Sequence, residues 1–283
     1  MIASSIPSPT VSEFFVRVQR QDGPGRPSYW ERFRVPYESD MNVISVLQRI
    51  AQQATTADGR HVAPVAWECN CLEEVCGSCT MVINGRVRQA CSALVARLLA
   101  ERPQEIELRP MSKFPVVRDL LVDRERMFET LKMIKAWVPV DSYLHLGSGQ
   151  RQSQETQQLA YQYSKCMTCG CCLEACPQYL KIELSRRAGE PEEEFQQRAR
   201  RLYDRSFMGA FAIAQIELFN SNPVGRMTAR ERLDALVSEA GIEVCGNAQN
   251  CVKVCPKEIP LTTAIARGGR AATWHALRTW FDQ

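Results

Sequence analysis

Cysteine is the residue type in this chain whose number and spacing suggest chemistry, because 13 of the 283 residues are cysteines. All of them fall into three groups, within residues 69–91, 166–176 and 245–255. The first ten residues contain no basic segment followed by an apolar stretch, so we expect no secretory signal and a reducing compartment, which disfavours disulfides. The three groups of thiols therefore indicate three metal centres.

The middle group has the spacing C-x2-C-x2-C-x3-C-P from Cys166 to Pro177. This spacing binds iron–sulfur clusters, and in two-cluster chains its fourth cysteine ligates the other cluster, so a second run is required. The second run lies between Cys245 and Pro256 and keeps the same frame, but Ala248 occupies the position of its second cysteine. One of the two clusters therefore lacks a thiolate ligand.

In two-cluster chains, the fourth cysteine of each run ligates the cluster held by the other run. This rule divides the cysteines of the two runs between two clusters. A [4Fe–4S] cluster is predicted to bind four thiolates, those of Cys166, Cys169, Cys172 and Cys255. A [3Fe–4S] cluster, with its missing corner near Ala248, is predicted to bind three, those of Cys176, Cys245 and Cys251. The alternative is a second [4Fe–4S] cluster with a non-cysteine fourth ligand. Cys171 fits neither register and is predicted to be a packed thiol.

The first group contains the plant-type spacing C-x4-C-x2-C followed by one distant cysteine, which is typical of a [2Fe–2S] centre. Its four predicted ligands are Cys71, Cys76, Cys79 and Cys91. The small residues Gly77 and Ser78 allow backbone amides to approach the sulfides. A structural zinc site typically uses two C-x2-C pairs, whereas this group has one. Cys69 is predicted not to be a ligand.

The residues around the first group, from 13 to 110, have the pattern of a small sheet domain. Apolar side chains alternate from Phe14 to Val18, and a second short strand at 30–35 follows a Gly/Pro turn, which predicts an edge hairpin. Between residues 43 and 54 the apolar positions follow the helical period, and Asp40 is a candidate N-cap.

A second hairpin is predicted around Asn84-Gly85, because both residues tolerate positive φ. Its strands are expected at residues 80–83 and 87–90, and residues 106–108 are expected to close the sheet. The sheet domain is thus predicted to present the first cysteine group on a loop and an adjacent strand.

Beyond residue 112 the alternating pattern gives way to helical ones, so we place a domain boundary between residues 112 and 113. Helices are predicted around residues 127–137 and 210–219, and a capping box from Thr228 to Glu231 predicts another. Residues 139–154 resemble a linker, and the charged stretch 185–205 is predicted to be a solvated helix plus a loop. The fold class is α+β, with residues 1–112 forming the [2Fe–2S] domain and residues 113–283 an all-α domain with two clusters.

Charge and hydropathy exclude two classes of function. The 35 Lys and Arg residues nearly balance the 32 Asp and Glu residues, and no basic block is present, so nucleic acid is not an expected partner. The best apolar run, residues 93–100, is interrupted by Arg97, so no membrane span is expected. Three clusters without a nucleophile, paired acids or a nucleotide fingerprint indicate a chain that transfers single electrons.

These motifs together resemble the iron–sulfur subunit of succinate dehydrogenase and fumarate reductase. The resemblance spans nearly the whole chain and, besides the cysteine groups, includes three further segments, Phe114–Asp119, Ser164–Gly170 and Val254–Lys257. It implies a β-grasp ferredoxin fold followed by a helical ferredoxin fold. It also implies a complex with an FAD-containing catalytic subunit and a membrane-anchor cytochrome b subunit, at the cytoplasmic face of the cell membrane. Electrons would then pass from flavin through [2Fe–2S], [4Fe–4S] and [3Fe–4S] to quinone.

The quinone implied by the resemblance is menaquinone. Ubiquinone-reducing relatives tend to have tryptophan shortly after the first Cys-Pro and histidine just after the first cysteine of the second run. This chain has Tyr179, Leu180 and Lys181 at the first place and Gly246 at the second. It therefore looks closer to the menaquinone-linked bacterial type.

Three alternatives stay open at the level of sequence. The first is a subunit of another flavin-linked dehydrogenase, of the glycolate-oxidase or heterodisulfide-reductase type, although such chains often retain the cysteine that Ala248 replaces here. The second is a fumarate reductase that works in the reverse direction. The third is a zinc-stabilised interaction module.

Overall fold

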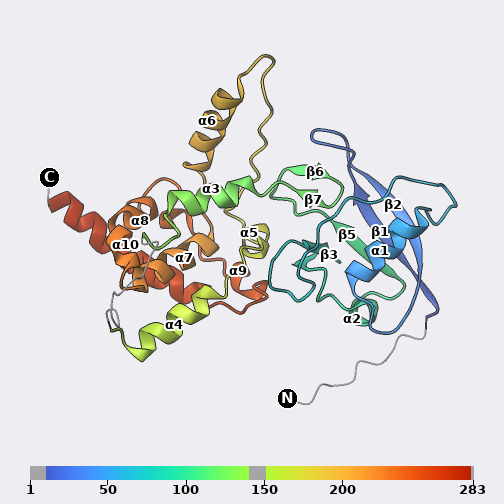
Figure 1. Cartoon of the computed structure of the whole chain (residues 1–283), viewed down its shortest axis with the longest axis horizontal. Coiled ribbons are helices and arrows are strands. Elements are labelled where there is room, and N and C mark those ends of the chain that lie inside the picture. The colour runs from blue at the N-terminus through green and yellow to red at the C-terminus, as the bar shows by residue number, and fades with distance from the viewer. Residues whose placement is uncertain (1–10, 140–150, 282–283) are drawn as a thin grey trace, which may run out of the picture. The chain divides into compact units, whose positions relative to one another are not determined.

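The computed structural model describes residues 11–139 and 151–281, and the chain divides into two compact units (Figure 1). The first unit is Met1–Asp123 together with Cys169–Cys171. The second is Arg124–Thr168 together with Cys172–Gln283. The linker predicted at 139–154 lies mostly outside the described residues. Within the described ranges, no helix combines the length and the hydrophobicity needed to cross a bilayer.

The first unit is built on a five-stranded mixed sheet with the order β2-β1-β5-β3-β4. Its strands are β1 (Glu13–Arg20), β2 (Tyr29–Pro36), β3 (Thr80–Ile83), β4 (Arg86–Gln89) and β5 (Glu105–Arg109). Both predicted hairpins are confirmed, since β1 pairs with β2 and β3 with β4 in antiparallel fashion. The strand predicted at 106–108 is present, but it lies in the middle of the sheet, parallel to β1 and antiparallel to β3. A strand that pairs on both sides joins the hairpins instead of closing an edge.

The core of the first unit lies between the sheet and helix α1 (Val43–Gln53), with α2 (Val95–Glu101) completing it. The alternation of β1 buries Phe14, Val16 and Val18, and the helical period of α1 buries its apolar face. The N-cap prediction was wrong. Asn42, not Asp40, accepts a hydrogen bond from the Ser45 amide on its side-chain oxygen at 3.0 Å. Asp40 has a φ of 62° and lies in the turn before the cap.

The turn between β3 and β4 has the geometry that its sequence predicts. Asn84 and Gly85 have φ values of 49° and 79°, and the two positive values match the right-handed twist of a hairpin. The side-chain oxygen of Asn84 also accepts a hydrogen bond from the Glu107 amide at 2.8 Å, so the turn is anchored to β5. A small two-stranded sheet, β6 (Val116–Arg118) and β7 (Leu121–Val122), was not predicted, because its strands are too short to show alternation.

A buried ion-pair network fastens β1 to the segment before the first cysteine group. Arg20 is 2% exposed, and its Nε donates to Asp119 at 2.8 Å while its Nη1 pairs with Glu31. The other oxygen of Asp119 accepts from the Ala66 amide at 2.8 Å, and Arg20 also donates to the Ala63 carbonyl. Burial by itself lowers the pKa of Arg20, but Asp119 and Glu31 outweigh it and raise the pKa.

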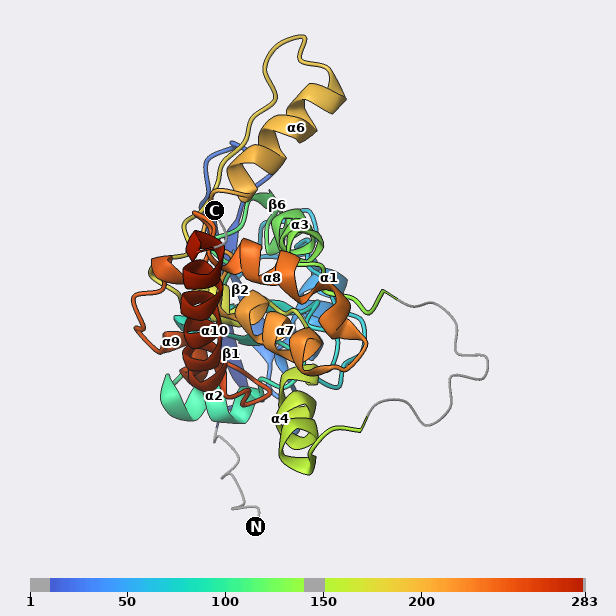
Figure 2. The ribbon, with the colours of Figure 1, turned by 90° about the vertical axis from the view of Figure 1, so that its left-hand side faces the viewer.

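The second unit consists of helices around a buried central one, α7 (Ala210–Ser221) (Figure 2). The other described helices are α3 (Glu125–Met133), α4 (Gln154–Ser164), α5 (Cys171–Glu174), α6 (Glu192–Tyr203), α8 (Ala229–Leu236), α9 (Asn250–Lys253) and α10 (Leu261–Phe281). Short 3-10 turns occupy Gly225–Thr228 and Ile242–Val244. Residues 210–217 are all buried, as expected of a mostly apolar helix, and the buried residues include two polar ones, Gln215 and Glu217. The predicted helix in the charged stretch is α6, whose surface is mostly exposed.

Helix α8 is confirmed, but its predicted capping box was wrong. Thr228 ends a 3-10 turn, and its hydroxyl donates backwards to the Gly225 carbonyl at 3.4 Å, with no side-chain hydrogen bond to the helix N-terminus. Glu231 instead pairs with Lys135 at 3.1 Å. The fully buried Arg232 then fastens α8 to the end of α3 and to the 3-10 turn, because its guanidinium donates to the carbonyls of Lys135 and Gly225.

Replacing Asp119 by alanine is expected to destabilise the chain by about 3 kcal/mol or more, because the substitution leaves Arg20 buried with one of its two carboxylate partners missing. The measurement is urea unfolding of the full chain, followed by far-UV circular dichroism. Glu13→Gln is the matched control, since it removes an ion pair with Arg34 in which both side chains are about half exposed. Equal stability of the two variants would show that the network contributes little.

Candidate iron–sulfur cluster sites

The loop of the first cysteine group directs backbone amides at its sulfur atoms. Cys71 Sγ accepts three amide hydrogen bonds at 3.3–3.4 Å, from Glu73, Val75 and Cys76. Positive φ values at Leu72 and Glu74, 61° and 56°, turn the chain so that these amides face inward. The Ser78 amide donates to Cys76 Sγ at 3.5 Å. Amide hydrogen bonds of this kind stabilise negative charge on sulfur.

The remaining two predicted ligands of this group are buried just before β3 and just after β4. Cys79 is 3% exposed and Cys91 is 7% exposed. Burial raises the pKa of Cys91 to about 11, and the neighbouring Cys79 and Cys71 add to the effect. Burial also acts to raise the pKa of Cys76, but hydrogen bonds from Ser78 and Cys71 outweigh it and lower the pKa to about 6. Cys69 is exposed.

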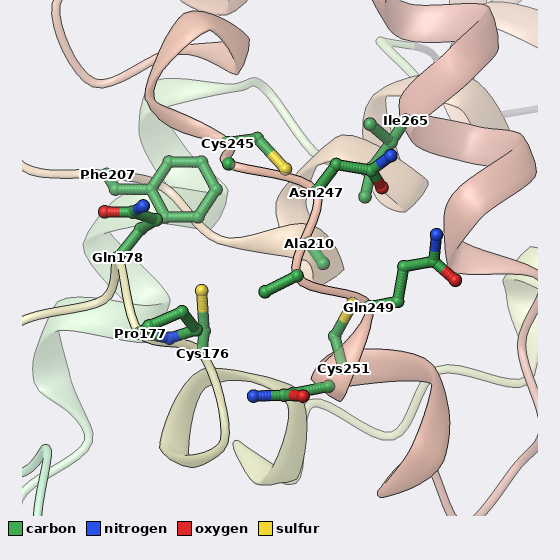
Figure 3. Close-up of a pocket in the computed structure, with 13 residues that line it drawn as sticks. Cys176, Pro177, Gln178, Phe207, Ala210, Cys245, Asn247, Gln249, Cys251 and Ile265 are labelled. Carbon is green, nitrogen blue, oxygen red and sulfur yellow. The ribbon is translucent and has the colours of Figure 1, made fainter.

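In the second unit, the three cysteines predicted to bind the [3Fe–4S] cluster line one pocket (Figure 3). Cys176 follows α5, Cys245 follows the second 3-10 turn, and Cys251 lies in the first turn of α9. Phe207, Ala210 and Ile265 form apolar parts of the wall. Burial raises the pKa of Cys251, and the charges of Cys176 and Cys245 raise it further. The structure thus brings these three thiols together.

The same pocket contains Ala248, the residue at the position of the missing cysteine. Its side chain is a methyl group, so this part of the wall offers no ligand atom. Asn247 and Gln249 on either side have positive φ values of 51° and 59°, which bend the chain around the pocket. The side chain of Asn250 donates to the Ala175 carbonyl at 3.2 Å and so joins the two cysteine runs.

Of the four cysteines predicted to bind the [4Fe–4S] cluster, Cys166, Cys172 and Cys255 belong to the second unit, and Cys169 is counted with the first. Their ligation stays a prediction. The segment after Cys172 is fixed by close packing, since a Cβ on Gly209 would lie 2.1 Å from the Leu173 side chain. Gly209 also has a φ of 87°, so glycine is required at this position on both counts.

One charged residue near the second-unit cysteines was missed from the sequence. Arg126 is 8% exposed, and it donates to the carbonyls of Leu180 at 2.7 Å and Phe207 at 3.1 Å. Its guanidinium lies 3.9 Å from the centre of the Tyr179 ring. Burial lowers the pKa of Arg126. An arginine in the first turn of an amphipathic helix gives no sequence signal of this role.

The chemistry of these donor sets fits iron–sulfur clusters. Soft thiolates, inward-facing amides and apolar walls are what such clusters require. Within residues 11–139 and 151–281, no three His, Cys, Asp or Glu side chains are arranged to hold a single metal ion. Ligands of a cluster are kept apart by the iron–sulfide core between them, so they need not converge on one point.

Two protein-family models match the regions of the chain that contain the three cysteine groups. The family described as "2Fe-2S iron-sulfur cluster binding domain" matches residues 15–129, and the family described as "4Fe-4S dicluster domain" matches residues 162–259. The fold resembles a chain in the solved structure of the Mycobacterium smegmatis Sdh1 complex in the apo form. The TM-score is 0.65, the identity is 20%, and the match covers 93% of this chain and 96% of that one.

Two curated relatives are similar over most of their length. The fumarate reductase iron-sulfur subunit of Mycobacterium tuberculosis is 30% identical over 74% of each chain. The succinate dehydrogenase iron-sulfur subunit of Bacillus subtilis is 46% identical over 93% of this chain and 94% of its own. This chain therefore belongs to the family of succinate dehydrogenase and fumarate reductase iron–sulfur subunits, which transfer electrons within a succinate:quinone oxidoreductase.

Proposed function

We propose that this chain passes electrons singly from an FAD-containing catalytic subunit to menaquinone, through a [2Fe–2S], a [4Fe–4S] and a [3Fe–4S] cluster in that order. The quinone would be bound at a membrane-anchor cytochrome b subunit, with this chain peripheral on the cytoplasmic face. Residues 1–112 would form the domain of the first cluster and residues 113–283 that of the other two. The observation that supports the proposal most is the pocket in which Cys176, Cys245 and Cys251 meet Ala248.

Each cluster is assigned to its own set of thiolates. Cys71, Cys76, Cys79 and Cys91 would hold [2Fe–2S]. Cys166, Cys169, Cys172 and Cys255 would hold [4Fe–4S], and Cys176, Cys245 and Cys251 would hold [3Fe–4S]. When bound, such clusters gain and lose one electron without making or breaking a covalent bond to a substrate. The chain supplies thiolates, amide hydrogen bonds and apolar walls that exclude water.

The buried acids of this chain support a role without bond chemistry of its own. Among the described residues the buried carboxylates are those of Glu31, Asp119, Glu190 and Glu217. Each is paired with an arginine: Glu31 and Asp119 with Arg20, Glu190 with Arg198, and Glu217 with Arg267. Glu31 and Asp119 share the buried Arg20 and are poorly suited to proton transfer, whereas the arginine partners of Glu190 and Glu217 are 20% and 50% exposed. Bond chemistry is assigned to the catalytic subunit.

The preference for menaquinone rests on the residues beside the three-thiol pocket. At the position where ubiquinone-reducing relatives tend to have histidine, a Cβ on Gly246 would lie 2.9 Å from Gln178 Nε2, so a side chain there would require the end of Gln178 to move. Tyr179 is 1% exposed beneath Arg126 and is not presented at the surface. Gly246 has no side chain and the Tyr179 side chain is buried, so neither residue presents a hydrogen-bond donor at the surface.

Replacing Cys71 by alanine is expected to abolish the [2Fe–2S] centre, because it removes a thiolate that three backbone amides are arranged to stabilise. The EPR signal of the reduced [2Fe–2S] centre should disappear while the signals of the other clusters persist. Cys69→Ala is the control, since this neighbouring thiol is exposed, and it should leave all signals intact. A lost [2Fe–2S] signal in the Cys69 variant would refute the assignment.

Replacing Ala248 by cysteine is expected to convert the three-iron cluster into a four-iron one, because a thiolate would then stand at the empty corner. The EPR signal of the oxidised three-iron cluster should be largely lost, and iron per chain should rise by one. Ala248→Ser adds a group of similar size that stays protonated at neutral pH, and it should keep the three-iron signal. An unchanged signal in the cysteine variant would contradict the ligand assignment.

The native complex is expected to reduce a menaquinone analogue with succinate faster than a ubiquinone analogue. The two rates are measured side by side on the purified complex, with the reverse reaction from fumarate as a second assay. A faster ubiquinone rate would overturn the quinone preference. Absence of activity with both succinate and fumarate would overturn the proposed partners.

A further inference from the structure

A buried amide lies between two cysteines of the first unit that belong to different groups. Gln89, the last residue of β4, is 0% exposed. Its side chain contacts Cys79 Sγ at 3.6 Å, Cys171 Sγ at 3.5 Å and the Thr80 hydroxyl at 2.8 Å from its nitrogen. These three partners are 3%, 0% and 2% exposed, so water does not compete for these hydrogen bonds.

Both the oxygen and the nitrogen of the Gln89 amide have hydrogen-bond partners when Cys79 is a thiol. The Cys79 thiol donates to Gln89 Oε1, and Gln89 Nε2 donates to the Thr80 hydroxyl and to Cys171 Sγ. The Thr80 hydroxyl has one proton, and its shortest acceptor is the Gly77 carbonyl at 2.7 Å. The orientation of the Gln89 amide is therefore set by which of its neighbours can donate.

If Cys79 ligates the [2Fe–2S] centre, as proposed above, the Gln89 amide must donate a hydrogen bond to it instead of accepting one. A metal-bound thiolate has no proton and can only accept. Rotation of the amide by half a turn exchanges its oxygen and nitrogen, which places an N–H group toward Cys79. The oxygen then faces Cys171 and Thr80. The Thr80 hydroxyl, which already lies 3.1 Å from Gln89 Oε1, and the thiol of Cys171 are the two side chains that can donate to it.

We propose that Gln89 is a positioning residue that donates a hydrogen bond to the Cys79 thiolate and thereby raises the reduction potential of the [2Fe–2S] centre, while the Cys171 thiol holds its amide in that orientation. An N–H dipole stabilises the more negative, reduced centre more than the oxidised one. Cys171, which ligates neither predicted cluster of its own run, thus acts on the cluster of the other cysteine group.

The first test is a redox titration of the [2Fe–2S] EPR signal in the full-length, cluster-loaded chain with Gln89→Leu. The reduction potential should fall by about 59 mV, which corresponds to a roughly tenfold smaller equilibrium constant for one-electron reduction. Gln53→Leu, an exposed glutamine of α1 in the same unit, is the control and should leave the potential unchanged. A potential equal to wild type in Gln89→Leu overturns the proposal.

The second test changes Cys171 and keeps Gln89. Cys171→Ala should lower the potential in the same direction, and Cys171→Ser, which keeps a donor, should restore it to near the wild-type value. Equal potentials in the alanine and serine variants would overturn the role of Cys171. A purely structural role of Gln89 would lower cluster content without shifting the potential of the centres that form, and this result would also overturn the proposal.

The two proposals fail in different ways. If the wild-type chain shows no [2Fe–2S] signal, or keeps that signal after Cys71→Ala, the proposed ligand assignment is wrong. If the wild-type signal is present and lost in Cys71→Ala, but its potential does not respond to Gln89→Leu, the assignment stands and the role of Gln89 is refuted.

Discussion

Repulsion between neighbouring thiolates is the constraint on which both cysteine sites depend. Several sulfur atoms must be held close together, and each becomes negatively charged when it ligates iron. In the first unit this negative charge is stabilised by a loop whose positive-φ residues turn three backbone amides toward Cys71. Elsewhere in this group, hydrogen bonds lower the pKa of Cys76, whereas burial raises the pKa of Cys91.

Each unit fixes its cysteines through elements that are themselves anchored by buried contacts. In the first unit, Arg20 and Asp119 connect β1 to Ala66, a few residues before the loop. In the second unit, α7 provides an apolar centre, and the absence of a side chain at Gly209 lets the segment after Cys172 pack against it. The cysteine loops themselves contain little regular structure, so this support is what keeps them in place.

The spacing of residues predicted the parts of the structure that depend on local pattern. Alternation predicted β1 and β2, Asn84-Gly85 predicted the second hairpin, and continuous apolarity predicted α7. The two caps were wrong because a cap depends on the backbone angles of one residue: Asp40 takes a positive φ, and Thr228 belongs to a 3-10 turn. The roles of Gln89 and Arg126 could not be predicted, since their partners are distant in the sequence or are backbone carbonyls.

The central position of β5 has a consequence for the order in which the first unit can form. The hairpin of β1 and β2 and the hairpin of β3 and β4 each consist of neighbouring segments, so each can form early from local contacts. They share a sheet only through β5, which comes after both in the chain. A nascent chain that has emerged past residue 89 but not yet as far as residue 105 therefore contains both hairpin sequences but not the strand that joins them, and its first cysteine loop lies between two halves that are not yet joined.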